Sequence, residues 1–331
     1  MKKIEILQFL RACGALSVFL SHFLGDYSIA QNRMGGQLGV AIFFVISGYL
    51  LVERTDYNQL KGYFVKKYVR LIPLYWLLTC VVATVGMIEP DLLHTGIISM
   101  KTVLKSLFLI PDAIPDTAYV QPILPVAWTL YLEVFVYILF YICIRICKDS
   151  RKAGFMTSIV LLILHIICST MKSDNIYLNT YGGMVVLYFA VGMMVSIFDK
   201  YIYARKNKTM KYSEAALAMI LFLLAEQFYG QVSYVKILFV GIIFMGIVRV
   251  MSEWKVPVFF INYGDISYSF YLLHYFIIKF FSRIIVKDDT NIIVCICMFA
   301  ITFAITYVLS KVSHRLIEIK FGSYLKKVLL H

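Results

Sequence analysis

The stretch FLRACGALSVFLSHF (residues 9–23) is an apolar run that contains two ionisable side chains, Arg11 near its start and His22 near its end. With its flanks it reaches the roughly 20 mostly apolar residues that a helix needs to cross the hydrocarbon core of a bilayer. In a helix, Arg11 and His22 would lie about three turns apart on one face, separated by about 16 Å along the axis. The stretch therefore predicts a membrane-spanning helix with one polar face.

The composition of the whole chain extends this prediction to a polytopic membrane protein. Of its 331 residues, 61% are hydrophobic and 15% are charged, whereas soluble globular domains contain about 45–50% apolar and about 25% charged residues. The seven cysteines fall inside apolar stretches, without the spacing of a disulfide framework or a metal finger. We therefore expect an all-α membrane protein that binds no metal.

Apolar stretches recur along the chain, and we expect about ten transmembrane helices in a single integral membrane domain over residues 1–331, with no appended extracellular domain. The first stretch lacks a small-residue cleavage site and is interpreted as a retained span. The second is short, and the glycine-containing pairs at 35–36 and 47–48 predict a helix packed inside the bundle. The expected spans lie near residues 5–24, 38–53, 68–87, 124–146, 155–171, 182–198, 213–229, 234–250, 265–285 and 292–312.

Lysine and arginine residues are unevenly distributed between the two sides of these predicted spans. Assigning the loops to alternate sides places 24 of the 32 basic residues on one side and 8 on the other. Because an excess of basic residues marks cytoplasmic loops, both termini are predicted to lie in the cytoplasm. The formal net charge of +13 is then explained by topology and by attraction to anionic membrane lipid. Nucleic acid is not expected as a partner.

Polar residues within or beside the predicted spans are candidates for function, because ionisable groups inside a bilayer usually face a cavity or a partner. The first group is the pair Arg11 and His22; alternatively, Arg11 reaches lipid phosphate and His22 lies among the outer headgroups. The second group is in VKKYVRLIPLYW, which opens the third span and places Lys66 or Lys67 on one helix face with Arg70. These cations could accept the phosphates of a nucleotide cofactor, or they could be ordinary positive charge on the cytoplasmic side.

The third group opens the fourth span, in PVAWTLYLEVFVY. Glu133 would lie inside the bilayer, where a lone carboxylate is costly unless it is paired or protonated. Thr129 would lie one turn above it on the same face, and Trp128 near the outer interface. His274 is another histidine in the middle of a predicted span. His165 has no polar neighbour in the sequence and is interpreted as a packed or hydrogen-bonded core histidine.

Together these segments resemble bacterial acyltransferase family 3, whose members are integral membrane proteins that acylate cell-surface glycans. The resemblance rests on the Arg-x10-His pattern of the first span, GVAIFFVISGYLL in the second, RLIPLYW opening the third, WTLYLE in the fourth and ISYSFYLLH near the end. It implies transfer of an acyl group, usually acetyl from acetyl-CoA, to a hydroxyl of a saccharide outside the cytoplasmic membrane of a bacterium. O-antigen or a similar glycan would be the acceptor.

The family motifs map onto individual residues of this chain. Arg11 and His22 match directly, as do Trp128 and Glu133, but the usual Arg-x-x-Arg of the third span has a lysine in its first place, Lys67. Lysine keeps the charge and loses the bidentate fork of arginine. The resemblance, together with the basic cluster found from helix spacing, then predicts three roles: a donor-binding cluster, a catalytic pair and two substrate-binding residues. These are, in order, Arg11, Lys66, Lys67 and Arg70; His22 with Glu133; and Trp128 with His274.

In this interpretation His22 acts as a general base on the sugar hydroxyl or as a transient acyl acceptor, and the sequence leaves both open. Glu133 would orient His22 or stabilise its imidazolium. Two alternative functions stay open as well. The chain could transfer succinyl or another acyl group, or it could export a glycan or lipid-linked sugar without catalysis, since polar intramembrane residues also suit transport.

Overall fold

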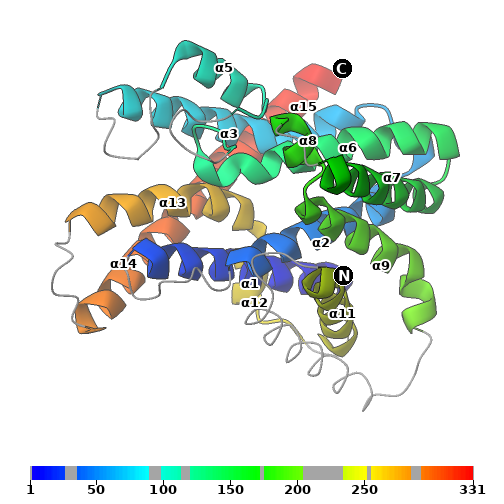
Figure 1. Ribbon diagram of the computed structural model, residues 1–331. Coiled ribbons are helices and arrows are strands. Elements are labelled where there is room, and N and C mark those ends of the chain that lie inside the picture. Colours follow the sequence, from blue (N-terminus) through cyan, green and yellow to red (C-terminus); the bar gives the residue numbers. More distant parts are fainter. Residues whose placement is uncertain are drawn as a thin grey trace. The chain divides into compact units, whose positions relative to one another are not determined.

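The fold of the chain is given by a computed structural model (Figure 1). It describes residues 2–26, 36–88, 98–112, 120–171, 175–203, 234–251, 255–284 and 292–330. Helices are the regular elements of these ranges, which contain no β-strand. The predicted all-α class is therefore confirmed.

The helices of the first half of the chain follow the predicted apolar stretches, because each run of apolar residues is long enough to form several helical turns. A short 3-10 turn, η2 (Pro125–Ala127), leads directly into α6. The bounds are α1 (Lys2–Asp26), α2 (Gly36–Arg54), η1 (Tyr57–Gln59), α3 (Tyr63–Ile88), α5 (Met100–Leu107), α6 (Trp128–Cys147) and α7 (Ser150–Met171).

The second half differs from the predicted boundaries at two places. Within the span predicted at 182–198 the continuous helix begins only at Leu187, because Gly182 caps a short helix and a 3-10 turn follows. These elements together form a candidate membrane span over Ile176–Phe198. The last helix does not end at 312 but continues through a π-helical segment, η4, into α15. The bounds are α8 (Ile176–Tyr181), η3 (Met184–Val186), α9 (Leu187–Tyr203), α11 (Tyr234–Met251), α12 (Val258–Asp265), α13 (Ser267–Ile284), α14 (Ile292–Ser313), η4 (His314–Phe321) and α15 (Gly322–Leu330).

Seven helices among the described residues are long and apolar enough to cross a membrane, and α11 is a shorter apolar helix. These helices confirm a multi-pass membrane architecture. The expected span at 213–229 lies outside the described residues. The total of ten spans, the cytoplasmic position of both termini and the single-domain assignment stay predictions.

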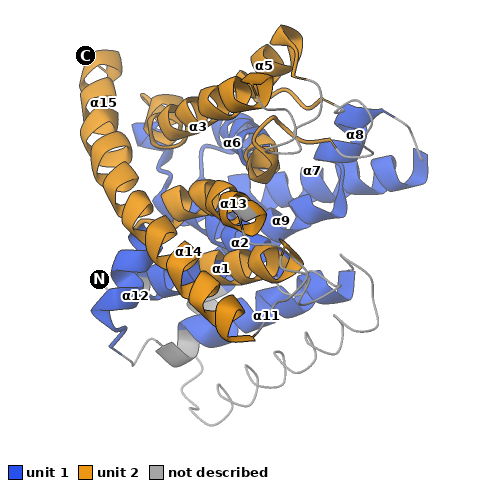
Figure 2. Ribbon diagram, turned by 90° about the vertical axis from the view of Figure 1, so that its left-hand side faces the viewer, with its two compact units in different colours: residues 1–14, 37–60, 132–265 blue, residues 15–36, 61–131, 266–331 orange. Residues whose placement is uncertain are grey.

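The chain forms two compact units, each built from three separate segments of the sequence (Figure 2). Unit 1 comprises residues 1–14, 37–60 and 132–265. Unit 2 comprises residues 15–36, 61–131 and 266–331. The helices α1 and α6 each contribute residues to both units.

Unit 1 contains a close contact between α2 and α9 that only glycine permits. A Cβ atom at Gly48 would lie 2.1 Å from the carbonyl oxygen of Phe189, and one at Gly192 would lie 2.1 Å from the carbonyl oxygen of Val45. Small residues at helix contacts let backbones approach closely in membranes, where lipid removes the hydrophobic drive for association. This contact confirms the expectation that α2 packs inside the protein.

Unit 2 has an aromatic core between α1, α13 and α14. The ring of Phe19 on α1 lies 5.5 Å from that of Phe270 on α13, and 5.5 and 5.6 Å from those of Phe299 and Phe303 on α14. Both α15 and η4 pack against α3 in the same unit. The aromatic core therefore fixes the second half of α1 against α13, and this contact positions the histidines described below.

The glycine contact in unit 1 yields a prediction about stability. Gly192→Ala should lower the thermal unfolding midpoint of the detergent-purified protein, because its Cβ would meet a backbone carbonyl that cannot rotate away. Overpacking of this kind costs about 1–3 kcal/mol or more. Gly322→Ala is the matched control, because its Cβ would meet only ordinary contacts at 3.5 Å and beyond. Equal midpoints for the two variants would contradict the proposed close approach.

Candidate active site

The predicted catalytic residue His22 lies on α1 beside His274 of α13. Their ring centroids are 5.2 Å apart, and both residues belong to unit 2. The ring of Tyr275 meets His22 edge-on at 5.8 Å. The structure therefore brings together two predicted site residues that are far apart in the sequence.

His274 is enclosed by aromatic side chains. The residue is 1% exposed, and the ring centroids of Phe19 and Tyr271 lie 6.4 and 5.8 Å from that of His274. Within the described part of the chain, neither ring nitrogen of His274 has a hydrogen-bond partner. A neutral imidazole has one donor and one acceptor nitrogen, and leaving both unused in a buried place is costly. His274 can thus offer both to a bound molecule beside His22.

The start of α6 is fixed to α13 next to this pair. The hydroxyl of Tyr271 donates to the backbone carbonyl of Val126 at 2.8 Å, and the hydroxyl of Thr129 contacts that of Tyr271 at 3.4 Å. Trp128, a predicted substrate-binding residue, is the first residue of α6 and is half-buried. The helix end that carries Trp128 is therefore anchored through Tyr271, which also borders His274.

Glu133 lies one turn further along α6, in unit 1. Its Oε1 accepts a hydrogen bond from Ser47 at 3.1 Å and another from the hydroxyl of Tyr137. Two hydroxyl donors satisfy a carboxylate that would otherwise be costly in the bilayer. A role of Glu133 in orienting His22 stays a prediction.

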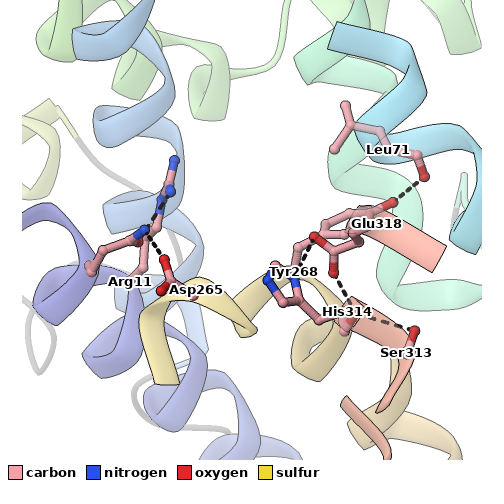
Figure 3. Close-up of polar contacts among 9 residues, drawn as sticks. Arg11, Leu71, Asp265, Tyr268, Ser313, His314 and Glu318 are labelled. Atoms are coloured by element: carbon pink, nitrogen blue, oxygen red, sulfur yellow. Dashed lines mark hydrogen bonds and ion pairs between the residues drawn. The ribbon is translucent and has the colours of Figure 1, made fainter. Parts of the chain in front are cut away.

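Arg11 belongs to a series of hydrogen-bonded side chains within unit 1 that the sequence did not reveal. Its guanidinium donates to the side-chain oxygen of Gln8 at 3.3 Å, and the amide of Gln8 donates to Asp265 at 2.5 Å (Figure 3). Gly264 makes this possible, because a Cβ at that position would lie 2.1 Å from the carbonyl oxygen of Gln8. Gln8 therefore connects Arg11 to the carboxylate of Asp265 at the end of α12.

The three remaining predicted cations lie in the first turns of α3, in unit 2. Lys66 and Arg70 are exposed, whereas Lys67 is half-buried with its amine 5.7 Å from the ring of Tyr63. Side chains four residues apart share a helix face, so Lys66 and Arg70 present two charges together. This arrangement suits phosphate groups. Whether Arg11 binds the same donor molecule stays a prediction.

The sequence also did not reveal a polar cluster around the buried carboxylate of Glu318 in unit 2, drawn in Figure 3. The side chain of Glu318 on η4 is 3% exposed and lies 3.1 Å from Nδ1 of His314. Ser269 on α13 donates to the same carboxylate at 2.5 Å, and Tyr268 donates to the backbone carbonyl of Leu71 at 2.6 Å. The cluster ties the first turn of α13 to η4 and α3. The same helix carries His274 further along.

Six of the eight predicted site residues therefore fall in unit 2, and Arg11 and Glu133 fall in unit 1. The basic residues of α3 belong to unit 2 as well. Among the residues that the structure describes, no group of three or more His, Cys, Asp or Glu side chains could hold a metal ion.

Comparison with known proteins assigns the chain to a family. The model of an acyltransferase domain family matches residues 4–311, which include all eight predicted site residues but not His314 and Glu318 of η4. The chain belongs to the acyltransferase 3 family. The resemblance seen in the sequence motifs is thereby confirmed, and the site above lies in an acyltransferase 3 domain.

Three relatives of this acyltransferase 3 protein have informative names. It is 28% identical over 165 residues to the exopolysaccharide production protein ExoZ of Rhizobium meliloti (strain 1021), an alignment covering 49% of this chain and 51% of that protein. It is 25% identical over 363 residues to a Staphylococcus aureus (strain COL) protein provisionally named an O-acetyltransferase, covering 97% of this chain and 58% of that protein.

The third relative is a protein of Acidianus two-tailed virus, provisionally named an acetyltransferase, which is 28% identical over 259 residues and aligned over 72% of each chain. The chain spans just over half the length of the Rhizobium and Staphylococcus proteins it matches. No solved structure matches it.

The cluster around Glu318 generates a prediction about stability. Glu318→Ala removes the carboxylate that accepts from Ser269 and pairs with His314, and losing the partner of a buried polar group costs about 1–3 kcal/mol. The unfolding midpoint in detergent should fall more for Glu318→Ala than for Ser269→Ala, which removes a hydroxyl that contacts Glu318 and Ser313 but keeps the pairing of Glu318 with His314. Arg315→Ala, an exposed neighbour in the same π-helical segment, should have little effect. Equal midpoints for all three variants would show that the cluster contributes nothing to stability.

Proposed function

We propose that this protein transfers an acyl group, usually acetyl from acetyl-CoA, to a hydroxyl of a saccharide outside the cytoplasmic membrane of a bacterium. The observation that carries the proposal is the position of His22. His22 lies on the membrane-spanning helix α1, beside the buried His274. The chain belongs to the acyltransferase 3 family. The names of the relatives, an exopolysaccharide production protein and two acetyltransferases, support a glycan acceptor and an acetyl group.

The chemistry assigned to His22 is general base catalysis. An imidazole with an unperturbed pKa near 6.5 can accept a proton at neutral pH, and a positioned base contributes about 10²–10⁴-fold to such a reaction. The imidazole takes the proton of the sugar hydroxyl while its oxygen attacks the thioester carbonyl carbon. The C–S bond then breaks, and the leaving thiolate of CoA takes the proton from the imidazolium. An alternative route, in which His22 carries the acyl group transiently, gives the same products.

The donor site proposed for this reaction uses the basic start of α3. Lys66, Lys67 and Arg70 would bind the phosphates of CoA by charge-assisted hydrogen bonds, with Arg11 as a further phosphate ligand implied by the family motif. The long pantetheine arm would carry the thioester from the cytoplasmic side into the membrane. Trp128 and His274 would then contact the acceptor, since His274 adjoins His22 and Trp128 begins the helix anchored next to it.

The first test replaces the proposed base. His22→Ala should abolish acetyl-CoA-dependent acylation of the glycan, while its abundance in the membrane stays near that of the wild type. His165→Ala is the matched control, because His165 is buried and bonds to the carbonyl of Gly182 at 2.7 Å and to Tyr234 at 2.9 Å. These hydrogen bonds confirm the prediction that His165 is a hydrogen-bonded core histidine.

His165→Ala should reduce stability and keep the turnover of each folded molecule. Turnover is measured as release of CoA from acetyl-CoA that depends on added acceptor glycan. A His22→Ala protein that retains more than a few per cent of wild-type turnover would remove His22 from the mechanism. Binding of acceptor without any release of CoA from the wild type would favour the glycan exporter instead.

The second test concerns the donor site. Arg70→Ala and Lys67→Gln should raise the KM for acetyl-CoA and leave kcat nearly unchanged, because phosphate contacts are made equally in the ground and transition states. A charge-assisted hydrogen bond shielded from water is worth about 1.5–3 kcal/mol, and 1.4 kcal/mol corresponds to about a factor of ten. Lys67→Arg should be neutral or mildly improving.

The control for this test is Arg145→Ala, an exposed arginine at the end of α6 outside the proposed donor site. Its KM for acetyl-CoA should equal that of the wild type. If Lys67→Gln and Arg70→Ala also keep the wild-type KM, the basic start of α3 serves only the orientation of the chain in the membrane.

A further inference from the structure

An ion pair lies one helical turn beyond His22, between α1 and α13 of unit 2. Asp26 is the last residue of α1 and follows His22 by four residues, so both side chains share a helix face. The amine of Lys279 lies 2.8 Å from Oδ1 of Asp26. The two side chains are 20% and 11% exposed for lysine and aspartate. The pair is therefore largely shielded from solvent.

The ring of Tyr275 connects this ion pair to the proposed reaction centre. It meets the ring of His22 edge-on at 5.8 Å, and the amine of Lys279 lies 5.8 Å from its centroid. Tyr275 and Lys279 are four residues apart on α13, as His22 and Asp26 are on α1. The four side chains thus form a series of contacts that leads from the imidazole to the carboxylate.

One oxygen of Asp26 is left over in this arrangement. Oδ2 is buried and, in the part of the chain that the structure describes, has no hydrogen-bond partner. A buried acceptor without a donor is costly. Lys279 neutralises the charge of Asp26 through Oδ1 and leaves Oδ2 able to accept one hydrogen bond from another molecule.

We propose that Asp26, Lys279 and Tyr275 form the acceptor subsite, in which Oδ2 of Asp26 accepts a hydrogen bond from a saccharide hydroxyl. The inference rests on the acyl transfer proposed above and names its acceptor contacts. Because the ion pair carries no net charge, the subsite suits an uncharged sugar ring. The bound hydroxyl belongs to the acceptor but differs from the one that reaches His22, because Asp26 lies a full turn away.

A purely structural ion pair would join α1 to α13 and do nothing else. Two variants separate that role from binding. Asp26→Asn can keep an oxygen toward Lys279 and place an amide NH2 where Oδ2 was, which turns an acceptor into a donor. Lys279→Arg keeps the ion pair, but its planar fork can occupy both carboxylate oxygens. A structural pair would be preserved or strengthened by Lys279→Arg, whereas a subsite would be blocked.

The experiment uses the full-length protein in nanodiscs, with acetyl-CoA and polysaccharide isolated from source cells in which the gene is deleted. Initial rates of CoA release are measured against each substrate. In both variants the KM for the polysaccharide should rise tenfold or more, and the KM for acetyl-CoA should stay within about twofold of the wild type. Unfolding midpoints report whether each variant is folded.

The matched control is Asp112→Asn, which alters a second Lys–Asp pair of unit 2. In that pair the amine of Lys105 lies 2.7 Å from Asp112, with side chains 25% and 24% exposed, and both KM values should be unchanged. A polysaccharide KM within twofold of the wild type in either folded variant, Asp26→Asn or Lys279→Arg, overturns the subsite and leaves the acyl transfer standing. If the wild type shows no acceptor-dependent release of CoA, both proposals fail together.

Discussion

An ionisable side chain inside a lipid bilayer must find its partner within the protein, because the hydrocarbon core contains no water to solvate it. The described helices meet this constraint with partners from the same helix and from neighbouring helices. Glu133 takes hydroxyl donors from Ser47 and Tyr137, and Lys279 takes the carboxylate of Asp26. The bonds of Ser47 to Glu133 and of Lys279 to Asp26 each fix one helix against another, whereas Tyr137 lies on the same helix as Glu133. Polar contacts therefore act together with the aromatic core and the glycine contacts in determining which helices are neighbours.

His274 is an exception to this pairing of polar groups, and the proposed acyl transfer uses it. The aromatic rings around it exclude solvent, yet its ring nitrogens lack partners among the described residues. A site that keeps polar groups unsatisfied until a substrate arrives holds them ready in a place of low dielectric, where electrostatic interactions are stronger than in water. The proposed mechanism uses that property next to His22. The same reasoning applies to the free oxygen of Asp26 in the proposed acceptor subsite.

Much of this could be predicted from the sequence, because membrane helices follow from the length of apolar runs alone. The close packing of α2 was visible at Gly48, and His165 was recognisable as a core histidine. The bond between Gln8 and Asp265 was not, since it joins residues that are 257 positions apart, and apolar periodicity does not specify which helices meet. Glu318 was missed for another reason. Its burial depends on η4, whose π-helical form has no clear sequence pattern.

The long terminal helix has a geometric consequence. From Ile292 to Leu330 it runs 39 residues without a break, which at about 1.5 Å per residue is close to twice the roughly 30 Å of a hydrocarbon core. A uniform α-helix of that length would carry a single contact stripe from end to end. The π turns of η4 contain more residues per turn and so change the phase of the helix between α14 and α15. One continuous rod thus packs against α13 at its start and against α3 at its end.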